Sequence, residues 1–338
     1  MNVILVGATG LLGHNVLITL LREGHNVITP VRNPLGICLP ADLQNHPNLH
    51  PVPFSFIASP HQTADAIGVG ALIDSDTAVI NCAGTTNMAL LHYDDYLPMN
   101  RDLVVQLLRL MDAFKLRTLV HVSTANTIGF GTPDSPATES CPMCPPFADS
   151  FYARSKREGE KLLEQAASQR PDSHIVILNP GFMVGAYDTH PSSGKLLLAG
   201  YRRRLMVSPS GGKSFVHVTD VARAAVNALT MGVSGQRYLL TGYDMSLKEF
   251  YSLQARECGY RKRCVVLPDW LLAIAGRVGD LLRLCGIRTQ LSTRNVRQLM
   301  VMEYYSDSLA VRDLKIGHTP LGTAIHDFFD WYNAQKQK

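Results

Sequence analysis

A short apolar strand runs directly into a glycine-rich turn where residues 3–13 read VILVGATGLLG. Gly7, Gly10 and Gly13 give the turn its spacing, and apolar residues at helical intervals follow over Leu11–Glu23. Glycines let a backbone approach a pyrophosphate, and the amides of a helix N-terminus bind its oxygens. This order of elements predicts a dinucleotide-binding turn that includes Thr9, Leu11 and Leu12. The alternative is a glycine-rich turn that binds no ligand.

Short apolar strands and longer amphipathic helices then alternate up to about residue 240. Strands are expected at Val3–Val6, Val27–Val31, Thr77–Cys82, Thr118–Val122, Ile175–Leu178, Phe215–Val218 and Tyr238–Leu240, with Pro30 marking a strand end. Helices are expected at Leu11–Glu23, Tyr96–Lys115, Phe151–Ala167 and Asp220–Met231. Such alternation calls for a parallel sheet covered on both faces. The predicted fold class is α/β, a doubly wound parallel sheet of the Rossmann type.

The alternation breaks after Gly181. Residues 186–214 are rich in Gly, Ser and Pro, and residues 246–310 read as mostly helical, with a strongly apolar stretch at Trp270–Leu284. Thr323–Asn333 reads as a closing amphipathic helix. We therefore expect residues 1–181, 214–242 and 311–338 to form the dinucleotide-binding domain. Residues 182–213 and 243–310 are expected to form a smaller, mostly helical lobe that binds the substrate.

Composition narrows the class of protein. The 338 residues are 46% apolar and 18% charged, which excludes disorder and coiled coil as the main state. A net charge of +4 is too small to indicate a nucleic-acid partner. No apolar run approaches the roughly 18 residues of a membrane span, and no signal-peptide pattern is visible, so we expect a cytoplasmic enzyme.

Seven scattered cysteines also favour a reducing compartment over a disulfide scaffold. Cys141 and Cys144 form one CxxC pair, which we interpret as a coincidence in a loop; a zinc or redox role is the alternative. No metal site is predicted.

Arg32 decides the predicted form of the cofactor. In an NAD enzyme, an Asp or Glu about 20 residues after the glycine turn binds the ribose hydroxyls. Here the second strand ends in Val31-Arg32-Asn33-Pro34, with no acid to repel a 2′-phosphate and an arginine that can pair with it. This pattern predicts NADP(H); the alternative is a solvated surface arginine.

Tyr152 and Lys156 lie four residues apart in YARSK and therefore share a helix face. A nearby ammonium favours the phenolate, so we expect Lys156 to lower the pKa of Tyr152. Ser123 and Thr124 end the preceding strand and are expected to face the same crevice. A second copy of the spacing, Tyr332 with Lys336, has no such partner, so we interpret it as a decoy.

The ordered motifs resemble the extended short-chain dehydrogenases/reductases over nearly the whole chain. The matching segments are GATGLLG, NCAG at 81–84, Asn100 opening a helix, HVSTANTIG, YARSK, LNPGFMVG and FVHVTDVA. The resemblance implies Tyr152 as catalytic acid/base, Lys156 as its activator and ribose ligand, and Thr124 as the catalytic hydroxyl, with Ser123 the alternative. The resemblance further implies cofactor contacts at Cys82, Ala83, Gly84, Asn100, Ser123 and Pro180.

The same resemblance implies a homodimer in which the helices Tyr96–Lys115 and Phe151–Ala167 of two subunits pack together. Leu162 and Leu163 fit an apolar outward face on the second helix, or they face the sheet.

Within the family, PVRNP, YARSKREGEK and NPGFMVGAYD resemble the dihydroflavonol 4-reductase and 3β-hydroxysteroid dehydrogenase branch. Epimerases of nucleotide sugars usually carry an Arg just before the FVHV segment, where this chain has Lys213 and Ser214. An Asp near the adenine is also missing from residues 51–56. Lys213 or the run Arg202–Arg204 remains available for a phosphate, although a solvated basic turn is the simpler interpretation of that run.

We therefore expect an NADP-dependent oxidoreductase that transfers hydride between NADPH and the carbonyl or alcohol of a small apolar substrate. The alternatives are an NAD(P)-dependent nucleotide-sugar epimerase or dehydratase, and a dinucleotide sensor without activity. The segment Trp270–Leu284 either packs the small lobe, lines an apolar substrate pocket or touches lipid. His217 is interpreted as a structural histidine.

Overall fold

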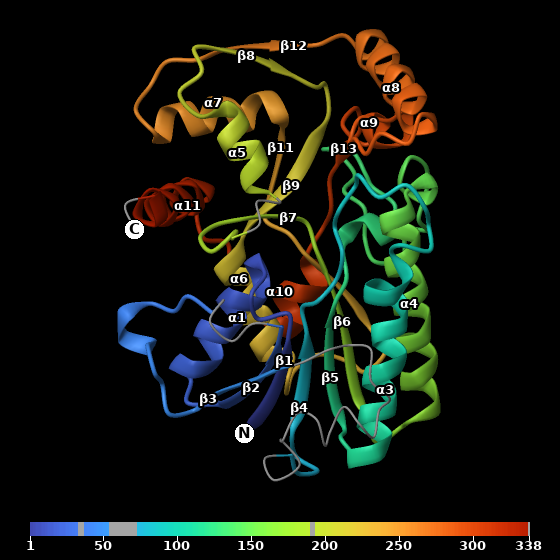
Figure 1. Ribbon diagram of the computed structural model, residues 1–338, viewed down its shortest axis with the longest axis vertical. Helices are drawn as coiled ribbons and strands as arrows, with labels where there is room; N and C mark the ends of the chain where they lie inside the picture. Colours follow the sequence, from blue (N-terminus) through green and yellow to red (C-terminus); the bar gives the residue numbers. More distant parts are fainter. Residues whose placement is uncertain (33–36, 54–72, 190–192, 337–338) are drawn as a thin grey trace.

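A seven-stranded sheet forms the centre of the larger part of the molecule in the computed structural model (Figure 1). The structure describes residues 1–32, 37–53, 73–189 and 193–336. In sheet order the strands are β10 (Arg237–Leu240), β6 (His174–Pro180), β5 (Thr118–Val122), β4 (Ala78–Asn81), β1 (Asn2–Val6), β2 (Asn26–Val31) and β3 (Leu49–Pro53), all paired in parallel. The strand order reverses between β1 and β4, so ligands are expected at the carboxyl ends of these two strands.

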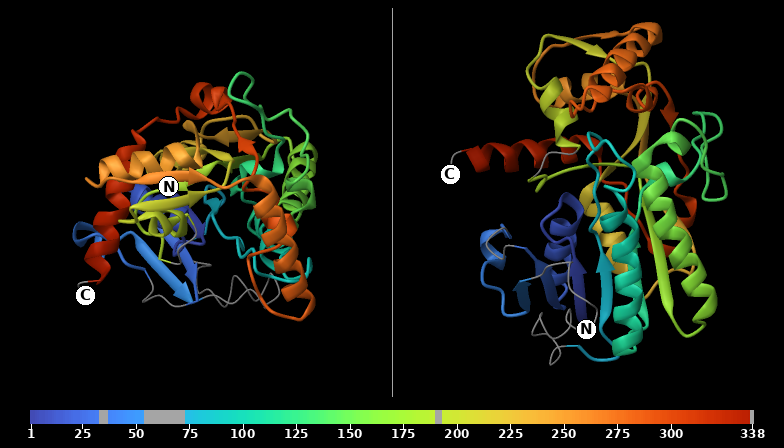
Figure 2. Two further views of the ribbon diagram at one scale, coloured as in Figure 1. Left: turned by 90° about the horizontal axis from the view of Figure 1, so that it is seen from above. Right: turned by 45° about the vertical axis from the view of Figure 1, so that its right-hand side comes forward.

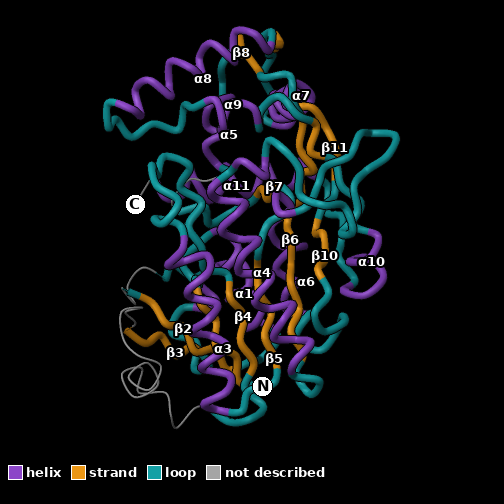
Figure 3. The backbone as a smooth tube through the Cα atoms, turned by 90° about the vertical axis from the view of Figure 1, so that its right-hand side faces the viewer, coloured by secondary structure: helices purple, strands orange, loops and turns teal. Residues whose placement is uncertain are grey.

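Helices cover both faces of this sheet (Figure 3). On one face α3 (Leu103–Phe114) and α4 (Phe151–Gln169) share a buried core with the strands. On the other face α1 (Leu11–Arg22), α6 (Val218–Asn227) and α10 (Ser308–Leu314) share a second core. The predicted doubly wound α/β fold is confirmed.

A smaller lobe lies beyond the carboxyl ends of the strands (Figure 2). Its helices are α5 (Gly194–Gly200), α7 (Leu247–Glu257), α8 (Asp269–Leu284), α9 (Thr293–Arg297) and α11 (Leu321–Lys336). A second sheet has the order β11-β9-β13 with β7 also paired to β9, their bounds being β7 (Phe182–Val184), β9 (Gly212–His217), β11 (Tyr243–Ser246) and β13 (Met302–Glu303). A two-stranded parallel ribbon joins β8 (Leu205–Ser208) to β12 (Arg263–Val266). Apart from β9, the sequence did not predict these strands, because stretches of two to four residues are too short to show a period.

The core of the small lobe draws on distant parts of the chain. The rings of Phe215 and Phe250 stack with centroids 4.3 Å apart, and Ile325 and Phe328 of α11 are buried in the same cluster. Helix α11 therefore packs with this lobe, whereas the sequence placed residues 311–338 with the larger domain. The predicted boundary at residue 310 also falls inside α10.

Strand β2 continues through Pro30 to Val31, where the sequence predicted an end at the proline. The pairing of β1 with β2 stops at Ile28, so Pro30 pairs with β3 and takes no place in the β1 ladder. The remaining short elements are a π-helical turn η3 (Pro98–Asp102) and the 3₁₀ turns η2 (Ala41–Leu43), η4 (Ala125–Thr127) and η5 (Phe147–Asp149). Within the described ranges, no helix combines the length and apolarity that crossing a membrane requires.

Candidate active site

The glycine turn after β1 packs tightly against its surroundings at two of its three glycines. Gly7 has a φ of 87°, and a Cβ on it would lie 2.6 Å from the backbone nitrogen of Ala83. A Cβ on Gly13 would lie 2.1 Å from the carbonyl oxygen of Gly7. Gly10 is different, because it is exposed and a Cβ there would meet only this carbonyl, at 3.6 Å. Gly7 and Gly13 thus allow close backbone packing, and Gly10 leaves one side of the turn open to solvent.

This open side faces the N-terminus of α1. Gly10 is the N-cap residue and supplies no side-chain cap, so the first helical amides remain for an anionic ligand. Leu11 and Leu12 are buried in the core and can offer a ligand only their backbone. The Thr9 carbonyl accepts a hydrogen bond of 3.1 Å from the Thr189 hydroxyl, which ties the turn to the small lobe. The turn therefore fits the diphosphate of a dinucleotide.

The segment Cys82–Gly84 after β4 forms the neighbouring wall. The Ala83 amide donates to Asn81 Oδ1 at 3.0 Å, which holds the segment against Gly7. A Cβ on Gly84 would lie 2.8 Å from Lys156 Nζ, so this predicted cofactor segment touches the predicted catalytic lysine. Burial raises the pKa of the Cys82 thiol to about 12, against the opposing charge of Lys156.

Asn100 holds this wall to α4. Its Oδ1 accepts from the Thr85 amide at 2.9 Å, and its Nδ2 donates to the Thr85 carbonyl at 3.2 Å and to Ser155 Oγ at 2.9 Å. The residue is fully buried in the π-helical turn η3. Its side chain thus positions the loop after β4, and direct contact of Asn100 with a cofactor stays a prediction.

Arg32 is exposed at the end of β2, next to the glycine turn in the sheet order. The following residues Asn33 and Pro34 lie outside the described residues, as do residues 54–56 of the stretch where no adenine-side Asp was found.

Thr124 and Tyr152 come together at the carboxyl end of β5. Thr124 is the N-cap of η4, and its buried hydroxyl accepts from the Asn126 amide at 3.3 Å. Burial raises the pKa of Tyr152 to about 12, a hydrogen bond from the Thr124 hydroxyl opposes this rise, and the Glu160 carboxylate adds to it. The expected lowering of the pKa of Tyr152 by Lys156 is therefore not met, because burial outweighs the effect of Thr124 and Lys156 is not among the groups that shift Tyr152.

Lys156 is buried one turn further along α4. Its ammonium donates to the Val122 carbonyl at 2.9 Å. Burial lowers the pKa of Lys156 to about 8, while the charge of Glu160 opposes the fall. The structure thus brings Thr124, Tyr152 and Lys156 to one place, as the sequence predicted.

Glu160 is a residue of this site that the sequence reasoning missed. It is fully buried, and its Oε1 accepts from the Thr127 hydroxyl at 2.6 Å and from Asn179 Nδ2 at 2.7 Å. Its Oε2 accepts from Arg157 at 3.1 Å and lies 3.7 Å from Arg237. The i, i+4, i+8 spacing from Tyr152 through Lys156 was the available signal.

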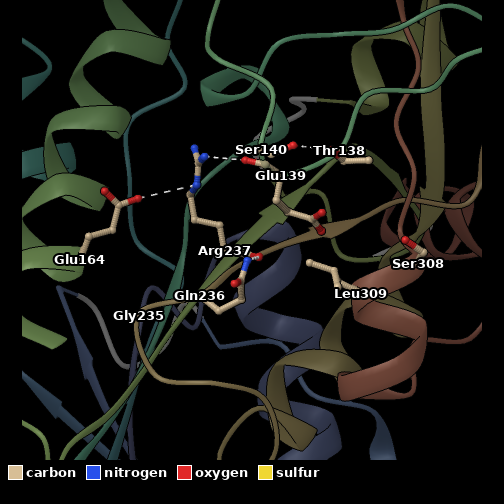
Figure 4. A pocket seen from close by; sticks show the side chains of 9 residues that line it. All are labelled: Thr138, Glu139, Ser140, Glu164, Gly235, Gln236, Arg237, Ser308 and Leu309. Carbon is tan, nitrogen blue, oxygen red and sulfur yellow. Dashed lines mark hydrogen bonds and ion pairs between the residues drawn. The ribbon is translucent and has the colours of Figure 1, made fainter. Parts of the chain in front are cut away.

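Arg237 connects this buried carboxylate to the surface. Its guanidinium donates to the Glu139 carbonyl at 2.6 Å and lies 3.6 Å from Glu164. Figure 4 shows these three residues in the pocket that they line. Arg157 of α4 and Arg237 of β10 therefore compensate the charge of Glu160, and both side chains keep some contact with solvent.

Two further predicted contacts lie at strand ends. The Ser123 hydroxyl is buried and has no hydrogen-bond partner among the described residues, so it is available to a ligand. Pro180 ends β6 and pairs with Leu240 of β10. Both positions border the carboxyl edge of the sheet.

The arrangement of a glycine turn, an open helix N-terminus and a Thr–Tyr–Lys set matches one family model. That model, described as the NAD dependent epimerase/dehydratase family, matches residues 3–240.

The chain belongs to this family.

The relatives of this chain include proteins named as reductases and proteins named as epimerases. A protein of Synechocystis sp. with the provisional name dihydroflavonol 4-reductase is 26% identical over 341 residues, covering 96% of this chain and 93% of that protein. The UDP-glucose 4-epimerase of Mycolicibacterium smegmatis is 29% identical over 304 residues, covering 84% and 88%. The solved UDP-glucose 4-epimerase of Thermotoga maritima with UDP-glucose matches with a TM-score of 0.76 at 17% identity, covering 99% and 100%. The protein is therefore an NAD(P)-dependent enzyme of the short-chain dehydrogenase/reductase type.

Two basic features of this epimerase/dehydratase family member were considered for phosphate binding. Lys213 is buried and forms an ion pair with Glu303. Arg202 and Arg204 line a recess with Tyr260–Arg263, which contains none of the predicted catalytic residues.

Other predictions concerned residues outside the crevice. The His217 ring caps α6 by accepting from the Thr219 amide at 3.1 Å, and it lies 3.1 Å from Asp327, so it has a structural role. Tyr332 stacks on Phe328 in α11, with Lys336 over its ring at 4.7 Å. Cys141 and Cys144 are free cysteines.

The two leucines considered for a dimer face point inward. Leu163 is fully buried, and Leu162 packs against the same core under α3 and α4. The predicted homodimer therefore rests on the family resemblance alone.

Proposed function

We propose that the protein is an NADP-dependent reductase that delivers hydride to the carbonyl carbon of a small apolar substrate. Tyr152 protonates the carbonyl oxygen and Thr124 polarises it. Lys156 binds the ribose of the dinucleotide. The observation that carries the proposal is the placement of Thr124 at the carboxyl end of β5 beside Tyr152 and Lys156 of α4, where Lys156 donates to the Val122 carbonyl at 2.9 Å.

Burial raises the pKa of Tyr152 to about 12, so the phenol keeps its proton at neutral pH and is poised to donate it to a developing alkoxide. The reverse oxidation needs the phenolate, which burial disfavours. The same residues therefore favour reduction over oxidation at neutral pH. Hydrogen bonding to both Thr124 and the substrate oxygen would align the phenol for this transfer.

The turn Gly7–Gly13, the segment Cys82–Gly84 and Lys156 are the residues that would hold the dinucleotide. When bound, the nicotinamide supplies the hydride. Arg32, at the end of β2 and with no acid beside it in the sequence, supports the preference for the 2′-phosphate of NADP(H).

Two observations favour an apolar carbonyl substrate over a nucleotide sugar. Lys213 is the cation nearest in sequence to the position before FVHV, where nucleotide-sugar epimerases carry an arginine. Its side chain forms an ion pair with Glu303 and is therefore not free to bind a diphosphate. The relative from Synechocystis, aligned over 96% of this chain, carries the provisional name dihydroflavonol 4-reductase. The alternative is the epimerase reaction, which the relative from M. smegmatis carries out by its name.

NADPH consumption separates the two reactions. We expect one NADPH oxidised per alcohol formed when the purified protein meets a panel of aromatic and alicyclic ketones, and no conversion of UDP-glucose. Tyr152→Phe serves as the inactive control and Tyr332→Phe as the matched active one. Conversion of a nucleotide sugar without net consumption of NADPH would refute the reductase proposal in favour of the epimerase.

A further inference from the structure

Helix α8 carries an apolar stripe that nothing in the described structure covers. Trp270, Ile274, Val278 and Leu281 follow one another at helical spacing and are 62%, 50%, 51% and 63% exposed. Leu284 extends the stripe at the end of the helix with 85% exposure. Monomeric proteins seldom leave such a contiguous row of large apolar side chains in water.

The opposite side of α8 is the packed one. Gly276 and Gly279 are buried, and a Cβ on them would lie 2.9 Å from Thr293 Cα and 2.2 Å from the Leu291 carbonyl oxygen. Asp280 accepts from the Thr293 amide at 3.1 Å. The glycines bring α8 close to the chain before α9, which fixes its apolar stripe outward.

Arg283 anchors the same side of α8 to the larger domain. Its guanidinium donates to the carbonyls of Met88 at 3.3 Å, Leu90 at 2.5 Å and Thr289 at 2.9 Å. The helix is therefore held in place by both lobes, and its exposed stripe is a fixed feature of the surface.

The β8–β12 ribbon, whose second strand directly precedes α8 in the chain, carries further exposed apolar side chains. Leu205 and Val207 pair with Arg263 and Val265, so these four side chains project from one face of the ribbon. Leu205, Val207 and Val265 are 60%, 50% and 44% exposed, while Met206 on the other face packs into the lobe core. Figure 1 shows the ribbon and α8 together at the end of the molecule farthest from the N-terminus.

The two stretches of chain that carry this apolar surface have a net positive charge. Residues 182–213 and 243–310 carry 15 Lys and Arg against 8 Asp and Glu, a net charge of +7 in a chain whose total is only +4. Beside the ribbon, the recess formed by Arg202, Arg204 and Tyr260–Arg263 contains no acidic residue. None of Arg202, Arg204, Arg261 and Arg263 forms an ion pair with a described residue.

We propose that α8 and the β8–β12 ribbon form a surface that binds bilayers containing anionic lipids. An amphipathic helix with a tryptophan and a basic surround lies in the plane of the bilayer interface, its apolar face among the acyl chains. The arginines around the ribbon would contact the phosphates of the headgroups. This inference concerns a surface outside the Thr–Tyr–Lys set and stands independently of the proposed reaction.

Vesicle flotation tests the proposal on the full chain. We expect the protein to float with vesicles of phosphatidylcholine that contain one-third phosphatidylglycerol, and to bind vesicles of pure phosphatidylcholine much more weakly. High salt should weaken the binding, because it screens the headgroup attraction. With Trp331→Phe, Trp270 is the one tryptophan left, and its emission should shift to the blue and be quenched by brominated lipid.

Matched variants separate the apolar and the charged parts. Trp270→Ser with Leu281→Ser should weaken vesicle binding by about 10- to 100-fold. Arg202→Gln, Arg204→Gln and Arg261→Gln together should weaken it by about 100-fold, at roughly tenfold or less per arginine. The controls on the larger domain are Met231→Ser with Val233→Ser, both exposed, and the triple variant Arg22→Gln, Arg117→Gln and Arg312→Gln. These four sets of substitutions alter exposed side chains, whereas Trp331→Phe alters a partly buried one. Thermal melting checks the folding of every variant.

Three results would overturn the proposal. The first is the absence of binding to phosphatidylglycerol vesicles, and the second is an equal loss of binding in the control variants. The third is that this surface is an interface between two copies of the chain. In that case the wild type would not bind vesicles, and sedimentation would show that Trp270→Ser with Leu281→Ser converts a dimer to a monomer.

Discussion

Lys156 and Glu160 lie four residues apart on the buried face of α4, with exposures of 3% and 0%. Glu160 stabilises the ammonium of Lys156 and opposes ionisation of Tyr152, so one carboxylate acts on both groups. Because Thr127 and Asn179 hold this carboxylate by hydrogen bonds, its distance from the two groups is fixed. We therefore regard Glu160 as a positioning residue of the proposed site.

Glu160→Gln should change the pH dependence of the enzyme. Removing the carboxylate removes the charge that favours the ammonium, so the pKa of Lys156 should fall below about 8. The limb of the pH profile of kcat/KM that reports Lys156 should then move to lower pH by about one unit or more. Glu164→Gln is the matched control, because Glu164 binds the same Arg157 at 2.7 Å and is not among the groups that shift Lys156. An identical profile in both variants would contradict the assignment.

Tyr152→Phe should preserve the fold and the cofactor affinity, because it removes a hydroxyl and no packing volume. Turnover should drop by about 10²- to 10⁴-fold, the usual contribution of a positioned general acid. Tyr332→Phe should change neither quantity, since Tyr332 stacks on Phe328 in α11. Steady-state kinetics and calorimetric titration with NADP measure both. Near-normal turnover in Tyr152→Phe would require another proton donor near Thr124.

Lys156→Met should remove a pH dependence of stability. The pKa of Lys156 is about 8 in the folded protein against an ordinary value of 10.5, so the unfolded chain binds more protons between these values. The free energy of unfolding of the wild type should therefore rise with pH from 8 to 10.5, by roughly 3 kcal/mol at most. Below pH 8 the cost of burying the ammonium is fully present.

Urea unfolding of wild type and Lys156→Met across this window measures the difference. The gap between the two proteins should change with pH only between the two pKa values. Parallel curves would mean that Lys156 titrates normally. Turnover and cofactor affinity should both fall in this variant, since the proposed role of the ammonium is to bind the ribose of the dinucleotide.

Arg32→Ala should reduce the preference for NADP(H) over NAD(H). Charge-assisted hydrogen bonds to the 2′-phosphate contribute about 1.5–3 kcal/mol, which corresponds to roughly 10- to 100-fold in affinity. Calorimetric titration of both cofactors gives the ratio. Arg22→Ala is the control, because Arg22 is exposed on α1 and pairs with Asp42 at 3.4 Å. A ratio unchanged by Arg32→Ala would refute its role.

The sequence predicted the large sheet well because its strands are unbroken apolar runs and its helices are long enough to show their period. It did not predict the edge strand β3, which contains Pro51 and Pro53. It also did not predict β7, β8, β11, β12 and β13, whose two to four residues depend on pairing with distant segments. The assignment of α11 to the larger domain failed for the same reason. The apolar face of α11 is visible in the sequence. Its packing partner, the core around Phe250, depends on tertiary contacts that the sequence pattern does not show.

The site was predicted in part. Spacing and strand ends pointed to Tyr152 and Lys156 and to the hydroxyls of Ser123 and Thr124, and only the family resemblance favoured Thr124. The structure places these residues at the carboxyl end of β5 and the start of α4. Glu160 was missed because a glutamate on a helix is usually solvated, and its burial follows from Thr127, Asn179 and Arg157, which come from separate elements. The pKa of Tyr152 was misjudged because sequence spacing carries no measure of burial.

The assembly of the small-lobe core has a consequence for biosynthesis. Its buried residues come from three stretches, around Val184–Phe215, Leu247–Tyr251 and Leu321–Phe329. Strands β1 to β6 leave the ribosome early and can begin to pair, but the lobe lacks Ile325 and Phe328 until α11 has been synthesised. A nascent chain released before α11 would therefore leave Phe215 and Phe250 open to chaperones and proteases, while the glycine turn is already formed.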